Sequence, residues 1–293
     1  MAEAVTAAPP ACYADTADYL TARVVEHRQV ADHTFRIRLE CPPLAARALP
    51  GQFAMVRIPH RSDPLLARPL AIYDTFADGR HADFLYLVHG KFTTALTDVR
   101  AGDELVVWGP LGNGFSPPPV DHLVLVAGGI GQTALLALGR ERLGDARYGA
   151  PPRPVPQARR VTFCWGARHA GLFGDVEDFR RAGMDVHLAT LDGSAGHKGT
   201  VVDLLDSVVG RDASDAAGTT HVACCGPEPM MAAVTRWSHA RGVSCDVSLE
   251  APMACGIGIC FTCVARVRDA TGAWDYRRTC VEGPVFAGAS IEW

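Results

Sequence analysis

The spacing of four cysteines near the C-terminal end constrains this chain more than any other feature. Cys255, Cys260 and Cys263 are spaced C-x4-C-x2-C, and Cys280 follows after a short excursion. Four thiolates in this arrangement are typical of plant-type [2Fe–2S] ligation. We therefore predict that Cys255, Cys260, Cys263 and Cys280 bind a [2Fe–2S] cluster.

The residues around these cysteines suit a compact metal-binding module. Gly256 and Gly258 are expected to take positive φ values, which glycine adopts at little cost, so that the loop can wrap around the cluster. Residues 264–268 and 275–278 are expected to form two strands of a hairpin with its turn at Thr271 and Gly272. Such a hairpin returns Cys280 to the loop.

Two other uses of these cysteines remain open. A structural zinc site usually contains two C-x2-C pairs, whereas this chain has one. Disulfides require an oxidising compartment, and residues 1–7 lack the basic start and apolar core of a signal peptide. We therefore expect a cytoplasmic protein whose remaining cysteines are small buried residues or free thiols. They are Cys12, Cys41, Cys164, Cys224, Cys225 and Cys245.

Length and charge limit the function classes. A chain of 293 residues can hold several domains, and its net charge of −4 gives no reason to expect binding to nucleic acid or to an anionic membrane. No apolar run is long enough to span a bilayer. Changes in pattern predict a multidomain α+β fold with a flexible tail, a barrel, an α/β domain and a cluster module. The expected bounds are 1–17, 18–116, 117–246 and 247–293.

The first folded part alternates short strands with turn residues. Six strands at close intervals and one helix near residues 94–99 predict a small antiparallel six-stranded β-barrel. The expected strands are 23–26, 34–39, 53–58, 67–73, 84–88 and 104–108.

After residue 121 the pattern changes to continuous apolar runs. Residues 122–127 suit a parallel strand that is buried on both faces. Further runs of this kind, separated by helical stretches, occur at 161–166, 186–190 and 221–226. This alternation predicts an α/β nucleotide-binding domain with a parallel sheet.

Three motifs in the barrel region suggest a flavin site. Arg68-Pro69-Leu70-Ala71 lies in an expected strand, where an arginine can neutralise a pyrophosphate and the following residues can line an isoalloxazine edge. The segment 90–94, with Gly90, Phe92, Thr93 and Thr94, opens the helix and offers N–H groups and hydroxyls to an anion. Residues 109–115 close the barrel. Each motif alone also suits a turn or cap without a ligand, and their ordered combination favours flavin.

Two glycine turns in the α/β region suggest a dinucleotide site. Gly128-Gly129-Ile130-Gly131 follows a buried strand, although it departs from G-x-G-x-x-G and also suits a turn without ligand. A later strand ends in Cys225-Gly226-Pro227, with Met230 just beyond it, and Asp192 ends the strand between them. Ligands of such sheets bind at the carboxyl ends of strands. Cys225 therefore either stands near a nicotinamide or is a small residue that fills space.

Taken in order, these motifs resemble the ferredoxin-reductase superfamily and, more closely, the electron-transfer subunits of class 1B dihydroorotate dehydrogenases. The similarity runs from about Tyr19 to Trp293 and is most specific in the segments 109–115, 192–199, 253–263 and 280–286. The resemblance implies FAD and a [2Fe–2S] cluster in this chain and an FMN-containing catalytic subunit as partner, in a heterotetramer with two copies of each.

The resemblance also assigns residues. It implies that Arg68, Pro69, Leu70 and Ala71 line the flavin, with Phe92 and Thr93 at its pyrophosphate. The next contacting strand would supply Leu85, Tyr86 and Leu87. Four positions depart from the family pattern: Ala71 replaces a usual serine, Leu87 a common arginine and Phe92 a common glycine, and the usual proline is missing from residues 131–134.

The predicted function is electron transfer by an oxidoreductase subunit. Nicotinamide exchanges a hydride, a cluster accepts single electrons, and a flavin does both, so it must lie between them. The resemblance implies dihydroorotate oxidation to orotate in pyrimidine biosynthesis, with net flow to NAD+. We expect NAD rather than NADP because no basic cluster follows the second α/β strand, although Arg168 and His169 lie there. The alternatives are a reductase subunit for a hydrogenase, sulfite reductase or ferredoxin partner, and a non-catalytic flavin-binding redox sensor.

Overall fold

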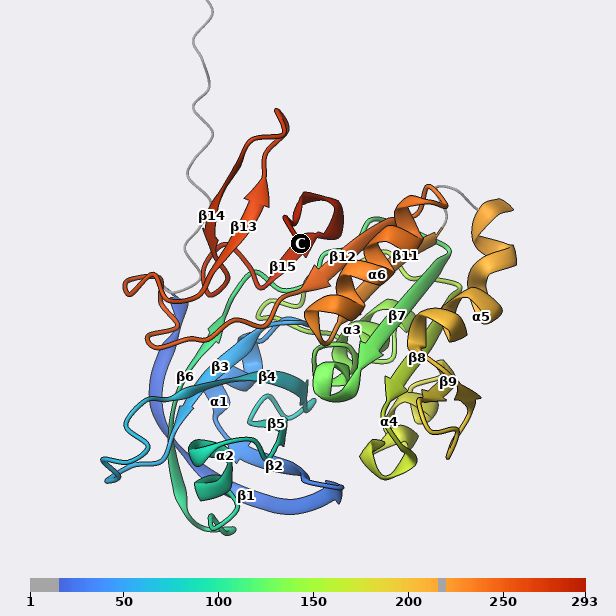
Figure 1. Ribbon diagram of the computed structural model, residues 1–293. Helices are drawn as coiled ribbons and strands as arrows, with labels where there is room; N and C mark the ends of the chain where they lie inside the picture. Colours follow the sequence, from blue (N-terminus) through green and yellow to red (C-terminus); the bar gives the residue numbers. More distant parts are fainter. Residues whose placement is uncertain (1–15, 216–219) are drawn as a thin grey trace, which may run out of the picture.

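The computed structural model describes residues 16–215 and 220–293, which form a barrel, a parallel sheet with helices, and a small C-terminal module (Figure 1). Most of the tail that we predicted, residues 1–15, lies outside the described residues, as does Cys12. None of the described helices is both long and apolar enough to cross a membrane.

The N-terminal part is a closed antiparallel barrel, as the short strands predicted. Its strands follow one another around the barrel in the order β1-β2-β5-β4-β3-β6. They are β1 (Asp18–Ala31), β2 (Thr34–Glu40), β3 (Phe53–Arg57), β4 (Arg68–Thr75), β5 (His81–Leu87) and β6 (Glu104–Leu111). Alternate side chains point inward and form one apolar core, which includes Val24, Ile37, Phe84 and Val107.

Two short helices accompany the barrel, α1 (Pro42–Arg47) and α2 (Lys91–Leu96). The predicted helix near 94–99 therefore begins earlier than expected. Gly90 has a φ of 88° and stands at its N-cap, and Phe92 and Leu96 both turn into the core. This spacing of four residues places the two side chains on one face of the helix.

The second part is a seven-stranded sheet in the order β10-β9-β8-β7-β11-β12-β15. The first six strands are parallel: β7 (His122–Gly128), β8 (Arg160–Ala167), β9 (Asp185–Thr190), β10 (His197–Lys198), β11 (Thr220–Cys225) and β12 (Ser244–Ser248). The four predicted apolar runs form β7, β8, β9 and β11, whereas β10 and β12 were not predicted. Every residue of β7 is buried. A strand with helices on both faces has no solvated side, which explains its continuous apolar sequence.

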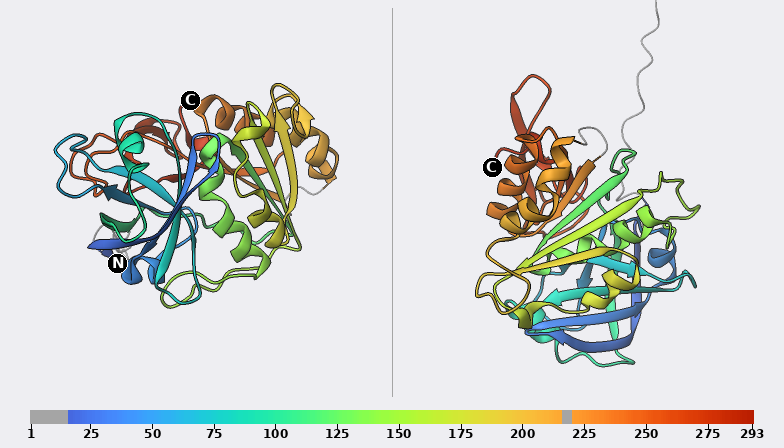
Figure 2. Two further views of the ribbon diagram at one scale, coloured as in Figure 1. Left: turned by 90° about the horizontal axis from the view of Figure 1, so that it is seen from below. Right: turned by 90° about the vertical axis from the view of Figure 1, so that its right-hand side faces the viewer.

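Helices cover both faces of this sheet (Figures 1 and 2). On one face, Leu123 and Leu125 of β7 share a core with α3 (Leu136–Leu143) and α4 (Val176–Arg181), and this core also contains Tyr73 of the barrel. On the other face, neighbouring β7 residues pack with α5 (Val201–Asp215) and α6 (Glu228–His239). The α3 and α4 side therefore faces the barrel.

The C-terminal module combines a separate hairpin with a strand of the large sheet. The hairpin strands β13 (Val264–Arg268) and β14 (Trp274–Arg278) pair antiparallel, close to the predicted bounds, and project away from both domains (Figures 1 and 2). The chain then returns as β15 (Val285–Ala287), which pairs antiparallel with β12. Since β12 crosses the predicted boundary at residue 247, the module is continuous with the α/β sheet.

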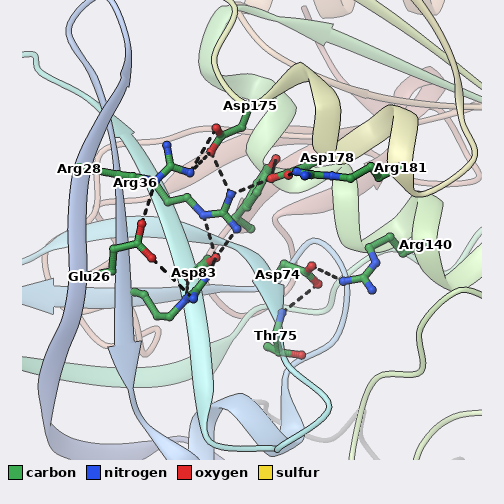
Figure 3. A network of polar contacts seen from close by, with 12 residues as sticks. Glu26, Arg28, Arg36, Asp74, Thr75, Asp83, Arg140, Asp175, Asp178 and Arg181 are labelled. Atoms are coloured by element: carbon green, nitrogen blue, oxygen red, sulfur yellow. Dashed lines mark hydrogen bonds and ion pairs between the residues drawn. The ribbon is translucent and has the colours of Figure 1, made fainter.

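A network of ion pairs joins the barrel to α4 (Figure 3). Arg36 of β2 bonds the fully buried Asp83 of β5 through Nε at 2.8 Å. Its Nη1 also reaches Asp175 at 2.9 Å and Asp178 at 2.7 Å, both on the α/β side. Tyr73 of β4 donates to the same Asp178 carboxylate at 3.1 Å.

A second polar link joins the barrel to α3. Asp74 of β4 pairs with Arg140 and accepts a hydrogen bond of 2.7 Å from the Tyr148 hydroxyl. Burial raises the pKa of Asp74, against the opposing effect of Arg140. Together, the two links fix how the barrel and the sheet face each other.

Candidate electron-transfer site

The predicted flavin strand β4 carries a cation without an acidic partner. Arg68 is exposed, forms no ion pair among the described residues, and donates one hydrogen bond of 3.1 Å to the carbonyl of Ala67. Further along β4, Ala71 is paired with Phe53 of β3. An exposed guanidinium at the start of β4, with no acidic partner among the described residues, fits a diphosphate ligand.

The residues predicted on β5 do not all face the same way. Leu85 packs in the core shared with the α/β domain, whereas Tyr86 points into the barrel, stacks on Phe35 and bonds His27 Nε2 through its hydroxyl at 2.8 Å. The strand period of two separates these neighbours. A ligand on the outer surface of the barrel can therefore contact the backbone of Tyr86 but not its side chain.

The start of α2 shows a similar division. Phe92 is buried in the barrel core, whereas Thr94 is exposed. Thr93 Oγ1 accepts a hydrogen bond of 2.6 Å from the His89 amide. Apart from its chain neighbours, no residue in the described part of the chain lies within 4 Å of a Cβ built on Gly90. The start of α2 thus has open space next to Gly90, whereas the Thr93 hydroxyl is already hydrogen-bonded to the His89 amide.

The structure brings the two predicted glycine turns together at the carboxyl ends of β7 and β11. A Cβ on Gly131 would lie 2.2 Å from the Cys225 carbonyl oxygen, and one on Gly128 would lie 2.5 Å from Met230 Sδ. Gly226 in turn lies against the Gly128 backbone. Glycine at these positions is required by the close approach of the two turns.

Asp192 lies at the carboxyl end of β9, in the same sheet. Its Oδ1 accepts hydrogen bonds of 2.9 Å from the Ser194 amide and 2.6 Å from the Ser194 hydroxyl, and these bonds lower the pKa of the carboxyl. The residue is exposed and belongs to a loop held by its own hydrogen bonds. Its predicted contact with a dinucleotide stays a prediction.

The junction between barrel and sheet contains a buried polar atom without a partner. The short 3₁₀ helix η2 (Gly129–Ala134) packs against β4 and β5. Within it, Gln132 is 1% exposed, and its Oε1 has no hydrogen-bond partner among the described residues. Native structures rarely leave such an atom unsatisfied, so the junction fits a bound polar group.

The four predicted ligand cysteines lie in two pairs. The sulfur atoms of Cys255 and Cys260 are 3.2 Å apart, and the Cys280 thiol is hydrogen-bonded to Cys263. All nine described cysteines are free. Across residues 16–215 and 220–293, no three His, Cys, Asp or Glu side chains converge as ligands of one metal ion would. Two separate thiol pairs fit a cluster with two irons better than a single zinc.

The local electrostatics favour thiolates at Cys260 and Cys263. Hydrogen bonds from the side chain and amide of Thr262 lower the pKa of Cys260 to about 6. The Cys280 thiol lowers the pKa of Cys263 to about 6, and its own pKa is raised by the same contact. Gly256 and Gly258 have φ values of 72° and 83°, as predicted for this loop.

The cysteine loop packs directly on the barrel strands. Cys263 and Cys280 share an apolar cluster with Phe53 and Met55 of β3 and Leu111 of β6. A Cβ on Gly256 would lie 2.5 Å from Met55 Cγ. Since Phe53 is also paired with Ala71 of the flavin strand, the loop and that strand are separated by few side chains.

Two tryptophans have contacts that the sequence did not reveal. Trp108 of β6 donates to the Cys255 carbonyl at 2.9 Å, and Trp165 of β8 donates to the Gly129 carbonyl at 2.8 Å. Because Trp108 and Cys255 are far apart in the sequence, no local sequence pattern indicates their contact.

Known proteins with similar sequences agree with this arrangement. Residues 250–292 match the iron–sulfur cluster binding domain of dihydroorotate dehydrogenase B. The chain is similar to the electron transfer subunit of dihydroorotate dehydrogenase B (NAD(+)) from Desulforamulus reducens, with 33% identity over 93% of this chain and 97% of that protein. The corresponding subunit from Shouchella clausii is 35% identical, over 90% and 94%.

Solved structures agree on the fold. An NADH-dependent reduced ferredoxin-NADP oxidoreductase superposes with a TM-score of 0.73 at 28% identity, covering 93% of this chain and 90% of that chain. A ferredoxin reductase of carbazole 1,9a-dioxygenase gives a TM-score of 0.64 at 20% identity, covering 78% and 67%. The fold is thus that of the ferredoxin reductases, and the relatives in sequence show that the chain belongs to the family of dihydroorotate dehydrogenase B electron transfer subunits.

Proposed function

We propose that this chain transfers electrons between NAD(H) and a catalytic subunit that oxidises dihydroorotate to orotate in pyrimidine biosynthesis. FAD in the barrel would exchange a hydride with nicotinamide and single electrons with a [2Fe–2S] cluster. The observation that carries this proposal is the position of the cysteines on the barrel, next to the predicted flavin strand. Cys263 and Cys280 pack on β3 and β6, and the Cys255 carbonyl is bonded by Trp108 of β6.

The protein's own groups would bind and orient these cofactors. Arg68 would neutralise the FAD diphosphate, the start of α2 would offer N–H groups to it, and Ala71 would line the ring. The turns 128–131 and 225–230 would hold the nicotinamide nucleotide where the carboxyl ends of β7 and β11 meet. Cys255, Cys260, Cys263 and Cys280 would hold the cluster.

The partner would be an FMN-containing catalytic subunit, in a heterotetramer with two copies of each. Ile259 and Phe261 support docking at the cysteine loop, since they lie within it and are 75% and 63% exposed. Large apolar side chains in such positions are frequent at protein interfaces. The free state of the nine described cysteines supports our placement of the protein in the reducing cytoplasm.

The decisive experiment uses the complex purified anaerobically with its natural partner. Visible spectra are recorded after addition of NADH and, separately, after addition of dihydroorotate. We expect bleaching of flavin and cluster absorbance by both reductants. Bleaching by NADH but not by dihydroorotate would exclude the pyrimidine role.

A second candidate is a reductase that serves a ferredoxin-like acceptor. It is favoured by the superposition on the NADH-dependent reduced ferredoxin-NADP oxidoreductase, at a TM-score of 0.73. The same experiment distinguishes the two, since this reductase would respond to NADH and to reduced ferredoxin but not to dihydroorotate. A chain that binds flavin without any bleaching would instead be a redox sensor.

A further inference from the structure

A single side-chain hydrogen bond from β6 fixes the first peptide of the cysteine loop. The Trp108 indole Nε1 donates to the Cys255 carbonyl at 2.9 Å. The indole is itself held in place, because Tyr19 of β1 is its partner in the β1–β6 register and stacks on it at 5.8 Å between ring centroids. A side chain of the barrel thus reaches a residue of the cluster module.

The bonded carbonyl belongs to the peptide that leads into the glycine turn. Gly256 follows with a φ of 72°, and the Ile257 amide then lies 3.4 Å from Cys255 Sγ. The Ile257 N–H belongs to the next peptide, whose direction depends on φ and ψ of Gly256, and rotation of the Cys255–Gly256 peptide changes that φ. The indole therefore restrains the donor that points at a ligand sulfur.

The barrel also leaves this peptide little room to move. A Cβ on Gly256 would lie 2.5 Å from Met55 Cγ and 3.1 Å from Leu111 Cδ1, so the turn lies flat on β3 and β6. These contacts are apolar and lack direction. Among the residues that the structure describes, the indole bond is the contact that specifies the orientation of this carbonyl.

We propose that Trp108 is a positioning residue that sets the reduction potential of the iron–sulfur site. By holding the Cys255 carbonyl, it keeps the Ile257 N–H directed at Cys255 sulfur. Hydrogen bonds to ligand sulfurs stabilise the more negative, reduced form of a cluster and so raise its potential. This inference rests on the proposed function and extends it, because it assigns control of the cluster to a strand of the flavin barrel.

The test is an anaerobic redox titration of the full FAD- and cluster-containing chain, followed by EPR of the reduced cluster. Trp108→Phe removes the donor and keeps an aromatic ring for Tyr19. Replacement of Trp108 by 3-benzothienylalanine keeps the shape of the indole and replaces only its N–H. This second variant shows whether an effect of Trp108→Phe comes from the lost N–H or from altered packing. Trp237→Phe is the matched control, since that indole donates to Asp206 on a distant helix surface at 3.0 Å.

We expect both Trp108 variants to lower the cluster's midpoint potential. The expected size is about a tenfold fall in the ratio of reduced to oxidised cluster at a fixed potential, which is about 59 mV for one electron. The EPR line shape should change as well, whereas Trp237→Phe should match the wild type in both respects. Potentials and spectra that are unchanged in both Trp108 variants would overturn the proposal.

The outcome for the wild-type chain separates this inference from the proposed function. A wild-type chain that shows no cluster signal after reduction would contradict the proposed function. A normal wild-type signal that is insensitive to Trp108 would contradict only the role of this tryptophan.

Discussion

Gly129 and Gly131 follow the same strand, but their surroundings differ. A Cβ on Gly131 would lie 2.2 Å from a backbone oxygen of Cys225, whereas no described residue beyond the chain neighbours lies within 4 Å of a Cβ on Gly129. The space above Gly131 is thus filled by the protein, and the space above Gly129 is open. In the proposed function, a nicotinamide nucleotide occupies that open space.

Alanine at the two positions should therefore have different effects. Gly131→Ala should lower stability by about 1–3 kcal/mol, because a backbone clash cannot be relieved by a rotamer change, and should abolish flavin reduction by NADH. Gly129→Ala, at a φ of 53°, should cost about 1–2 kcal/mol at most and weaken NAD+ binding at least tenfold. Urea unfolding and calorimetric binding of NAD+ measure both quantities. Normal NAD+ affinity in both variants would argue against a dinucleotide at this turn.

Cys41 illustrates a buried thiol that affects stability rather than chemistry. It is 0% exposed in the barrel core, and burial raises its pKa to about 12. The folded state therefore retains this proton at a pH where the unfolded thiol, with a pKa near 8.5, has lost it. Its contribution to stability is complete below about pH 8.5 and is lost as the pH rises towards 12.

Removal of this thiol should make the protein less sensitive to alkali. We expect the free energy of unfolding of Cys41→Ala to fall less steeply with pH between 9 and 11, by up to about 1.4 kcal/mol per pH unit. Urea unfolding at a series of pH values measures the slope, with wild type as reference. Identical slopes for the two proteins would show that the thiol does not titrate as described.

At the scale of elements, α4 is fixed to the barrel by charges and not only by apolar packing. Arg36 lies between the buried Asp83 of the barrel and the two aspartates at the start of α4 (Figure 3). Its side chain is 12% exposed and Asp83 is fully buried. A buried carboxylate that loses part of its counter-charge is costly, because water cannot replace the lost partner.

Arg36→Met should consequently destabilise the protein by about 3–5 kcal/mol and loosen the contact between barrel and sheet. The control is Arg80→Met, which breaks an exposed pair with Glu40 and should cost at most about 1 kcal/mol. Urea unfolding gives the stability, and hydrogen exchange in residues 168–181 reports the contact. Equal small losses in the two variants would contradict a structural role for the network.

At the scale of the whole molecule, local patterns predicted the parts and not their contacts. Cysteine spacing, glycine after a buried strand and short alternating strands specified the loop, the turn and the barrel, because each depends on neighbours in sequence. The sequence did not indicate that Tyr86 turns inward, that β15 pairs with β12, or that Trp108 reaches Cys255. These features depend on register and on residues that are distant in the chain.

The assembled molecule suggests one order of electron transfer. The glycine turns meet at the sheet edge that faces the barrel through η2, and the cysteine loop packs on β3 and β6 of the same barrel. The barrel thus lies between the nucleotide turns and the cysteines. Electrons from NADH should reach the flavin first and the cluster second.

Rapid anaerobic mixing of NADH with the isolated chain tests this order most directly, with flavin absorbance and freeze-quenched EPR of the cluster as readouts. We predict that flavin bleaching precedes the cluster signal. In Cys263→Ser the flavin should still bleach while the cluster signal is lost, and Cys245→Ser should behave as wild type. Reduction of the cluster before the flavin, or loss of flavin bleaching in Cys263→Ser, would contradict the account.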